Sequence, residues 1–275
     1  MAEILNGKQL AKGIHKQIKQ KVAQLDEQPV LAVLLIGKDP ASHTYVRIKE
    51  EECRKAGIGF ELFLYPSDEP EENLINTIDE LNKCNDVHGI LVQLPLPSQN
   101  ADKIIAAIDP TKDVDGFHRI NIDKLKNGDA KLVSAVAMGV MRLIGLSGTH
   151  LREKQTVVVA SDLFAEPIVE LLHHRHANVT VLHADDAELG KKTKKADVLI
   201  TAVGKPELIT GAMIKKGAIV IDVGTTRVSG HIVGDVEFES ANLVAKAITP
   251  VPGGVGPMTV AMLLENILIA YELNK

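Results

Sequence analysis

The apolar positions in the first third of the chain alternate between two spacings. From residue 10 to residue 25 they recur at three- and four-residue steps, the spacing of one face of an amphipathic helix. Residues 30–36 then form an unbroken apolar run that ends at Gly37, as a buried strand does. The alternation continues with a helix that Ser42 caps and that runs to about Lys55, a strand over residues 61–64, a helix carrying Leu74, Ile78 and Leu81, and a strand over residues 88–92.

A second series of the same kind follows a polar, glycine-containing stretch near residues 121–131. Its expected strands cover residues 156–159, 179–182, 198–203 and 218–223, its expected helices residues 164–174, 187–194 and 212–215, and a last helical segment residues 259–271. Strands that alternate with helices form parallel sheets covered on both faces. We therefore predict an α/β protein of two domains with a cleft between them. These are an N-terminal α/β domain over residues 1–120, a Rossmann-type domain over residues 121–256, and a C-terminal helix, residues 257–275, packing back on the first domain.

The composition argues against several classes of partner. Of 275 residues, 31 are basic and 36 acidic, and this net charge of −5 disfavours nucleic acid and anionic membranes. The longest apolar run, residues 30–36, is far shorter than the roughly 20 residues of a membrane span. Cys53 and Cys84 form neither a disulfide framework nor a zinc site, and no basic start followed by an apolar stretch is visible. We therefore expect a cytoplasmic protein.

Tyr45 and Lys49 stand four residues apart on the second expected helix and so share one face. If that face points into the cleft, a partly desolvated lysine has its charged form disfavoured and exchanges protons near neutral pH. Tyr45 would then hydrogen-bond the lysine or stack on a planar substrate. The spacing alone favours a solvated surface pair, because most tyrosines and lysines on helices are structural.

Three other segments carry chemistry-bearing residues in loops. Gln93 ends an apolar strand, where α/β sheets place ligand groups, although a strand-terminal amide also caps turns. Asp113 and Asp115 lie beside Gly116, and this pattern suits either an amino-bearing ring or an Asx turn. Residues 249–257 hold three prolines and three glycines, as in a loop that brings bare backbone close to a ligand, or in a hinge. The histidines near residues 173–176 lack convergent ligands, so we expect no metal.

Together these segments resemble the bifunctional methylenetetrahydrofolate dehydrogenase/cyclohydrolase family, from about residue 4 to residue 271. The resemblance rests on five ordered segments. They are Tyr45-Val46 with Lys49 three positions further on, Gln93-Leu94-Pro95-Leu96-Pro97, Lys112-Asp113-Val114-Asp115-Gly116-Phe117, residues 217–222, and the uninterrupted ITPVPGGVGPMT of residues 248–259. So many ordered matches favour the functional interpretation of these residues over the structural one.

The resemblance implies oxidation of 5,10-methylenetetrahydrofolate with NADP and hydrolysis of the 5,10-methenyl product to 10-formyltetrahydrofolate. It makes Lys49 the central acid/base and cation, and Gln93 the residue that holds its amine. It also implies that Asp115 accepts hydrogen bonds from the pterin ring and that Tyr45 stacks on folate. The loop of Pro252, Gly253 and Gly254 would line the folate and nicotinamide side, and the protein would be a homodimer.

The second domain departs from the family at its dinucleotide loop. The family pattern is roughly G-R-S-x-x-V-G-x-P, and the matching run here begins Val159-Ala160-Ser161-Asp162. We expect Val159, in place of the first glycine, to hinder the tight turn, and the Asp162 carboxylate to repel a pyrophosphate. The cofactor-binding residues implied by the resemblance are Val159, Ala160, Ser161, Ala184 and Thr225.

These departures leave several functions open. Asp185 and Asp186 follow Ala184 and suit a free ribose 2′-hydroxyl, so the protein uses NADP, uses NAD, or hydrolyses the methenyl compound while binding dinucleotide weakly. A non-catalytic folate-binding paralogue is a third possibility, although each catalytic position that can be matched is intact. An amino-acid or shikimate-type dehydrogenase also joins a small α/β domain to a Rossmann half, but the proline-glycine loop and the Tyr45/Lys49 spacing argue against it.

Overall fold

The computed structural model describes all residues, Met1–Lys275, and they form two compact units. The first unit contains Met1–Ala11 and Val136–Thr259, and the second contains Lys12–Ala135 and Val260–Lys275. The first helix, α1 (Gly7–Val22), and the last helix, α10 (Val255–Leu273), each begin in the first unit and continue in the second. The two domains predicted from the sequence, with their boundary at residue 120, remain a prediction.

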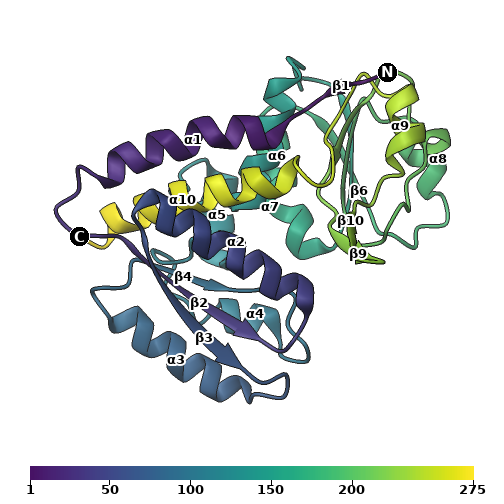
Figure 1. Cartoon of the computed structure of the whole chain (residues 1–275). Helices are drawn as coiled ribbons and strands as arrows, with labels where there is room; N and C mark the ends of the chain where they lie inside the picture. The colour runs from purple at the N-terminus through teal and green to yellow at the C-terminus, as the bar shows by residue number, and fades with distance from the viewer. The chain divides into compact units, whose positions relative to one another are not determined.

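The second unit is built on a three-stranded parallel sheet with the order β3-β2-β4. Its strands are β2 (Val30–Ile36), β3 (Gly59–Tyr65) and β4 (Gly89–Val92), and its helices are α2 (Pro40–Ala56), α3 (Glu71–Lys83), α4 (Ala101–Ile105) and α5 (Arg119–Asn127), with most of α1 and α10. Helices α2 and α3 lie on opposite faces of this sheet (Figure 1). Both faces are therefore covered, and β2 is apolar along its whole length, as the sequence predicts.

Alternate residues of β2 divide between the two faces of this sheet. Ala32, Leu34 and Ile36 belong to one buried cluster that also contains Leu74 and Ile78 of α3. Residues one position away along β2 point to the other face, because successive side chains in a strand alternate. This arrangement fixes β2 in the centre and brings the carboxyl ends of β2 and β4 to the same edge of the sheet.

Helix α2 begins earlier than the sequence analysis predicts. Asp39, rather than Ser42, is the N-cap, and its carboxylate accepts a hydrogen bond from the Ser42 backbone N–H at 2.8 Å. Pro40 occupies the first turn, where its missing N–H has no intrahelical partner to lose. The prediction of Ser42 as the cap was wrong because a carboxylate three residues before it satisfies that N–H.

The first unit contains a six-stranded sheet with the order β1-β11-β8-β7-β5-β6, in which every pairing is parallel. Its strands are β1 (Glu3–Ile4), β5 (Gln155–Ala160), β6 (Asn178–Leu182), β7 (Val198–Ala202), β8 (Ile219–Asp222) and β11 (Ala247–Ile248). Its helices are α6 (Ala135–Leu146), α7 (Asp162–His173), α8 (Leu189–Thr193), the 3₁₀ turn η1 (Gly211–Met213) and α9 (Phe238–Val244). Counted from β5, the order 2-1-3-4-5 is a doubly wound one, which places the switch in strand order between β5 and β7. The predicted α/β class is confirmed.

Several parts of the chain differ from the predicted elements. The sequence analysis predicts no element at α6, nor at the short elements β1, α4, α9 and β11. Residues 121–131, expected to be a polar connection, are mostly the helix α5, whose buried face carries Asn121, Ile122 and Leu125. Strands β9 (Thr226–Val228) and β10 (His231–Val233) form an antiparallel hairpin that the sequence analysis did not anticipate. Both elements are short and polar, so their apolar periodicity is weak.

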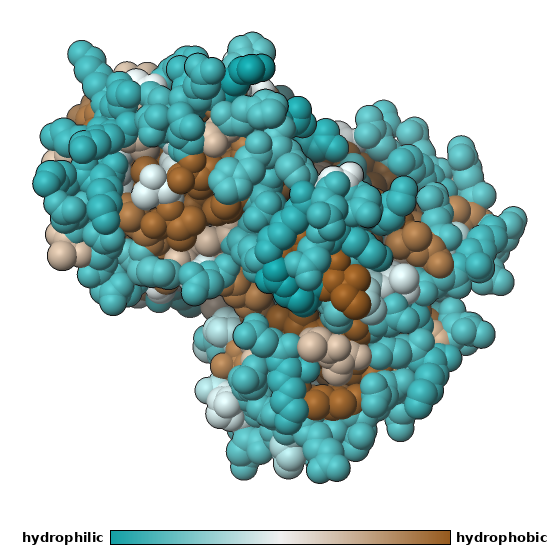
Figure 2. Space-filling view, turned by 180° about the vertical axis from the view of Figure 1, so that it is seen from behind, coloured by the Kyte–Doolittle hydropathy of each residue, from teal (hydrophilic) through white to brown (hydrophobic).

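Helix α10 is long and apolar enough to cross a membrane by length and composition, but 67% of its most apolar window is buried inside the protein. Within the second unit, Asn266 of this helix donates hydrogen bonds to the backbone oxygens of Val114 and Val133, both at 2.8 Å. The helix therefore has the burial of a core helix. Hydrophilic residues cover most of the face in Figure 2, and hydrophobic residues reach that surface in several separate places.

Candidate functional site

Lys49 lies on the buried face of α2. The buried residues of this helix recur at three- and four-residue steps: Ser42, Val46, Lys49, Cys53 and Ala56. A lysine in such a stripe is unusual, because lysines are almost never buried without a partner. The exposed fraction of Lys49 is 8%, so its amine is largely removed from water.

Gln93 provides the partner of the Lys49 amine. The Lys49 Nζ donates a hydrogen bond to Gln93 Oε1 at 2.9 Å, and Gln93 Nε2 donates to the backbone oxygen of Leu94 at 2.7 Å. The Gln93 backbone N–H also donates to Leu34 O, which continues the strand pairing one residue beyond β4. The amide of Gln93 is thus held at both ends, and its oxygen faces Lys49.

The loop that carries Asp115 is shaped by its neighbour Asp113. The buried Asp113 carboxylate accepts hydrogen bonds from the backbone N–H groups of Gly116 at 3.1 Å and His118 at 2.8 Å, and from Asn121 Nδ2 at 3.0 Å. Asp115 is half-buried and accepts none of these bonds. The sequence analysis left open whether these aspartates form a turn or face a ligand. In the structure Asp113 forms the turn, whereas the Asp115 carboxylate lies near Lys49.

Burial shifts the proton affinities of this group of residues. Loss of water lowers the pKa of the Lys49 ammonium, and the nearby Asp115 carboxylate opposes that shift. The same loss of water raises the pKa of the Asp115 carboxyl, and Lys49 opposes it. Burial also raises the pKa of the Cys53 thiol to about 12, so this cysteine one turn after Lys49 stays protonated.

The structure therefore brings together three of the predicted catalytic side chains, Lys49, Gln93 and Asp115. Tyr45 is half-buried one helical turn before Lys49, on the same side of α2. A lysine of lowered pKa beside a fixed amide and a carboxylate is suited to proton transfer. The tyrosine ring offers a flat surface for a planar ligand.

The proline-glycine loop belongs to the first unit, where it follows β11. Gly254 is buried, and a Cβ there would lie 2.6 Å from the Pro250 backbone oxygen. The Gly253 backbone oxygen accepts a hydrogen bond from the Lys8 N–H at 2.9 Å, while Pro252 is exposed. The loop is thus a close-packed turn with an exposed tip.

The turn after β5 does not need the glycine that the family pattern has. Val159 and Ala160 are strand residues with exposed fractions of 0% and 1%, and Val159 packs into the core of the first unit. No residue from Val159 to Asp162 has a positive φ, so the backbone turns at Ser161 without strain for any side chain. The expectation that Val159 hinders this turn is wrong, because its side chain points into the core.

The beginning of α7 fits a dinucleotide phosphate. Ser161 is the N-cap of this 12-residue helix, and its side chain makes no capping hydrogen bond. Asp162 is 94% exposed and lies 3.7 Å from the imidazole of His183, which follows β6. The carboxylate therefore extends into solvent rather than into the turn.

Two other predicted cofactor residues lie at the same edge of this sheet. Ala184 follows β6 and Thr225 follows β8, and both are half-buried. Asp186 is paired with Lys192 at 2.9 Å, and this pairing lowers the pKa of the Asp186 carboxyl. The positive charge of Lys192 thus offsets one of the carboxylates after Ala184.

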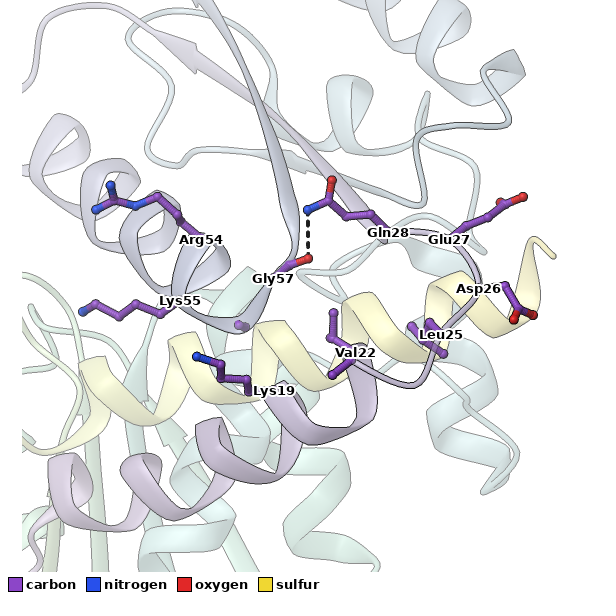
Figure 3. A pocket seen from close by; sticks show the side chains of 11 residues that line it. Lys19, Val22, Leu25, Asp26, Glu27, Gln28, Arg54, Lys55 and Gly57 are labelled. Carbon is purple, nitrogen blue, oxygen red and sulfur yellow. Dashed lines mark hydrogen bonds between the residues drawn. The ribbon is translucent and has the colours of Figure 1, made fainter.

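One hollow of the second unit contains none of the predicted site residues. It has a volume of about 480 Å³ and lies between the carboxyl ends of α1 and α2 (Figure 3). Lys19, Arg54 and Lys55 lie on one side, and Asp26 and Glu27 on the other (Figure 3). Basic residues at helix carboxyl ends are common because they offset the helix dipole, so we assign no role to this hollow.

The sequence analysis missed two buried carboxylates in the first unit, Asp222 and Asp235. They are 3% and 0% exposed and accept backbone hydrogen bonds from three loops. The signal in the sequence was Gly224 and Gly234, two glycines that each lie within two residues of one of these carboxylates.

Comparison with known proteins matches both units. The tetrahydrofolate dehydrogenase/cyclohydrolase catalytic-domain model matches residues 5–115, and the NAD(P)-binding-domain model of the same name matches residues 134–275. The bifunctional protein FolD of Halothermothrix orenii is 45% identical over 100% of this chain and 99% of its own length.

Two solved structures have the same fold over their whole length. The Campylobacter jejuni enzyme FolD, a methylenetetrahydrofolate dehydrogenase/cyclohydrolase, is 38% identical with a TM-score of 0.93 and full coverage of both chains. The Trypanosoma brucei methylenetetrahydrofolate dehydrogenase-cyclohydrolase, solved with NADP and an inhibitor, is 35% identical with a TM-score of 0.93, covering 99% of this chain and 98% of that one.

Proposed function

This chain belongs to the tetrahydrofolate dehydrogenase/cyclohydrolase family, and we propose that it oxidises 5,10-methylenetetrahydrofolate and hydrolyses the 5,10-methenyl product to 10-formyltetrahydrofolate. The observation that carries this proposal is the buried Lys49 amine, 2.9 Å from the fixed oxygen of Gln93 and close to Asp115. Family membership also separates the chain from amino-acid and shikimate-type dehydrogenases.

The second unit would bind the folate. Asp115 would accept hydrogen bonds from the amino and ring N–H groups of the pterin, which are donors that a carboxylate matches. Tyr45 would stack on the flat part of the substrate next to the reacting carbon. The pKa of Asp115 is raised by burial, and donors from the substrate would favour its ionised form.

The hydrolytic step needs a group that takes and returns a proton. Water adds to the methenyl carbon, which forms a C–O bond, and the C–N bond of the ring then breaks as that nitrogen is protonated. The neutral Lys49 amine would accept one proton of the attacking water and return it to the departing nitrogen, and the other proton would leave the new hydroxyl for solvent as the formyl C=O forms. Gln93 Oε1 would hold the amine in place during both transfers, because it accepts a hydrogen bond from either form.

The oxidation needs NADP, which accepts the hydride that leaves the methylene carbon. Ser161 and the first N–H groups of α7 would hold a phosphate of the dinucleotide. Ala184 and Thr225 lie at the same edge of the sheet and would line the site, whereas Val159 and Ala160 would support it from the core. Loss of hydride leaves the methenyl cation, which Asp115 would stabilise by its charge.

Assays of both reactions on one preparation test this proposal. We expect purified protein to reduce NADP with 5,10-methylenetetrahydrofolate and to remove the absorbance of the 5,10-methenyl compound faster than buffer does. Substituting NAD for NADP in the same assay establishes the preferred dinucleotide. Folate binding without either reaction would contradict the proposal and would make the chain a non-catalytic paralogue.

We also propose that the protein is a cytoplasmic homodimer. The resemblance to the family supports the dimer, and the two free cysteines suit a reducing compartment. Light scattering on eluting protein should give twice the mass of one chain. A monomer at micromolar concentration would contradict the proposed assembly.

A further inference from the structure

Asp222, the last residue of β8, holds two loops of the first unit through its side chain. Its Oδ1 accepts hydrogen bonds from the backbone N–H groups of Gly224 at 2.9 Å and Asp235 at 3.1 Å, and from Thr201 Oγ1 at 3.3 Å. Its Oδ2 accepts from the Val236 N–H at 2.9 Å. Four donors thus point at this buried carboxylate, three at Oδ1 and one at Oδ2, and donors of this kind favour its ionised form.

Asp235 continues the network to a third loop. Its Oδ2 accepts a hydrogen bond from the Val203 N–H at 2.7 Å, and its Oδ1 accepts from the Lys205 N–H at 2.9 Å. Both donors belong to the segment that follows β7. The two carboxylates thus connect the ends of β7 and β8 to the segment after β10.

The backbone approaches these carboxylates more closely than a side chain would permit. A Cβ at Gly224 would lie 2.2 Å from the Asp235 carboxyl carbon, and a Cβ at Gly234 would lie 2.0 Å from Asp222 Oδ2. The Asp222 backbone N–H donates to Thr249 Oγ1 at 2.7 Å, directly before the proline-glycine loop. The network therefore also reaches the last predicted binding loop of this unit.

A purely structural role does not require charged groups at this place. Burial raises the pKa of Asp222 to about 7, so holding it ionised opposes folding. Two of the loops that this pair of carboxylates holds follow the carboxyl ends of β7 (through Asp235) and β8 (through Asp222), the edge where doubly wound sheets bind dinucleotides. Groups that lower stability and lie at such an edge are candidates for function.

We propose that Asp222 and Asp235 are positioning residues for the dinucleotide: their carboxylates fix the loops after β7 and β8 in the conformation that binds it. This inference rests on the proposed dehydrogenase activity. The hydrolytic reaction, which needs no dinucleotide, is independent of the network. The two carboxylates act through backbone and do not touch the reacting atoms.

The first test compares three variants on both reactions. Asp222→Asn and Asp235→Asn each replace an acceptor oxygen by an amide group facing backbone donors, and we expect each to raise the Kd for NADP about tenfold or more. The rate of methenyl hydrolysis should stay within about twofold in both. Asp197→Asn is the matched control, because Asp197 lies at the amino end of β7 and accepts from the Gln155 N–H at 3.0 Å and from Lys215 at 2.6 Å. It should change neither quantity.

The second test needs no variant for its main observation. The titratable groups around Asp222 are Asp235, Lys205, Glu207, Glu237 and Glu239, and the three glutamates line a cavity of about 240 Å³ with it. Because protonation of Asp222 removes an acceptor, the Kd for NADP of the wild type should rise as the pH falls through about 7. The Kd for NADP should depend less on pH in Asp222→Asn. The phosphate groups of NADP titrate equally in both experiments, so the difference between the two proteins reports Asp222 alone.

Three outcomes would overturn the proposal: an unchanged Kd for NADP in both variants, an equal loss of the two activities in folded variants, or identical pH dependences in wild type and Asp222→Asn. If Asp222→Asn does not fold, Asp235→Asn and the wild-type pH dependence decide the question. Absence of dehydrogenase activity in the wild type would instead refute the proposed function.

Discussion

Replacing Lys49 by glutamine should abolish hydrolysis without unfolding the protein. Glutamine keeps a polar group near Gln93 but cannot accept a proton from water. Positioned acid/base groups contribute about 10²- to 10⁴-fold to a rate, so the loss corresponds to about 3 to 5 kcal/mol of transition-state stabilisation. The free energy of unfolding should be unchanged or higher in Lys49→Gln. The Lys49 residue is only 8% exposed and its partner is a neutral amide, so folding pays the cost of removing the ammonium from water, and glutamine avoids that cost.

The assay follows the absorbance of the methenyl compound at fixed pH, together with urea unfolding of each protein. Lys55→Gln is the control on the same helix, because the Lys55 side chain is 61% exposed and pairs only with Glu52. It should leave the rate unchanged. A rate for Lys49→Gln within about threefold of the wild type would refute the acid/base role. A marked loss of stability in this variant would make Lys49 a structural residue instead.

Four further predictions concern other parts of the chain. Asp162→Ser should tighten NADP binding about two- to fivefold at low salt and have no effect at high salt, measured by titration, because an exposed charge near a helix N-terminus is screened. Lys112→Met should lower the free energy of urea unfolding by about 3 kcal/mol, because the buried Lys112 amine donates to three backbone oxygens near the end of α3. Burial raises the pKa of Asp222 from 3.8 to about 7, so its stabilising contribution is complete below about pH 4 and is lost as the pH rises through 7. The wild type should therefore lose up to about 4 kcal/mol of unfolding free energy relative to Asp222→Asn between about pH 4 and pH 8, and equal pH dependences would contradict this. A thiol reagent should modify the half-buried Cys84 of the folded protein and leave Cys53 unmodified, because Cys53 is fully buried and its thiol pKa is about 12.

The sequence predicts the longer strands and most of the long helices because their apolar periodicity is strong, whereas the four shortest strands and the evenly apolar helix α6 were missed. Residues 30–36 are the strand β2 as expected, and the four-residue spacing of Tyr45 and Lys49 places both on α2. The sequence cannot show that Lys49 falls in a buried stripe until the other buried positions of α2 are known. Asp113 and Asp115 are likewise indistinguishable by pattern, and only the hydrogen bonds of the loop separate them.

Two of the errors arise where tertiary contacts override local signals. The valine at position 159 looks like an obstacle beside a phosphate loop, yet it is a strand residue in the core. Asp222 and Asp235 are 13 residues apart and resemble ordinary surface carboxylates in the sequence, and they meet only because β8 and the hairpin after it return the chain to the same place. The apolar periodicity of a sequence does not predict such contacts between residues distant in the chain.

The central claim is that the Lys49 amine is buried and loses its proton more readily than an ordinary lysine. It can be tested directly by NMR titration of protein carrying ¹³C at the lysine Cε, with the Lys49 signal identified by its absence from Lys49→Gln. We predict that this signal titrates well below the exposed lysines, because loss of water lowers the pKa of the Lys49 ammonium. A Lys49 signal that titrates together with the exposed lysines would contradict the account.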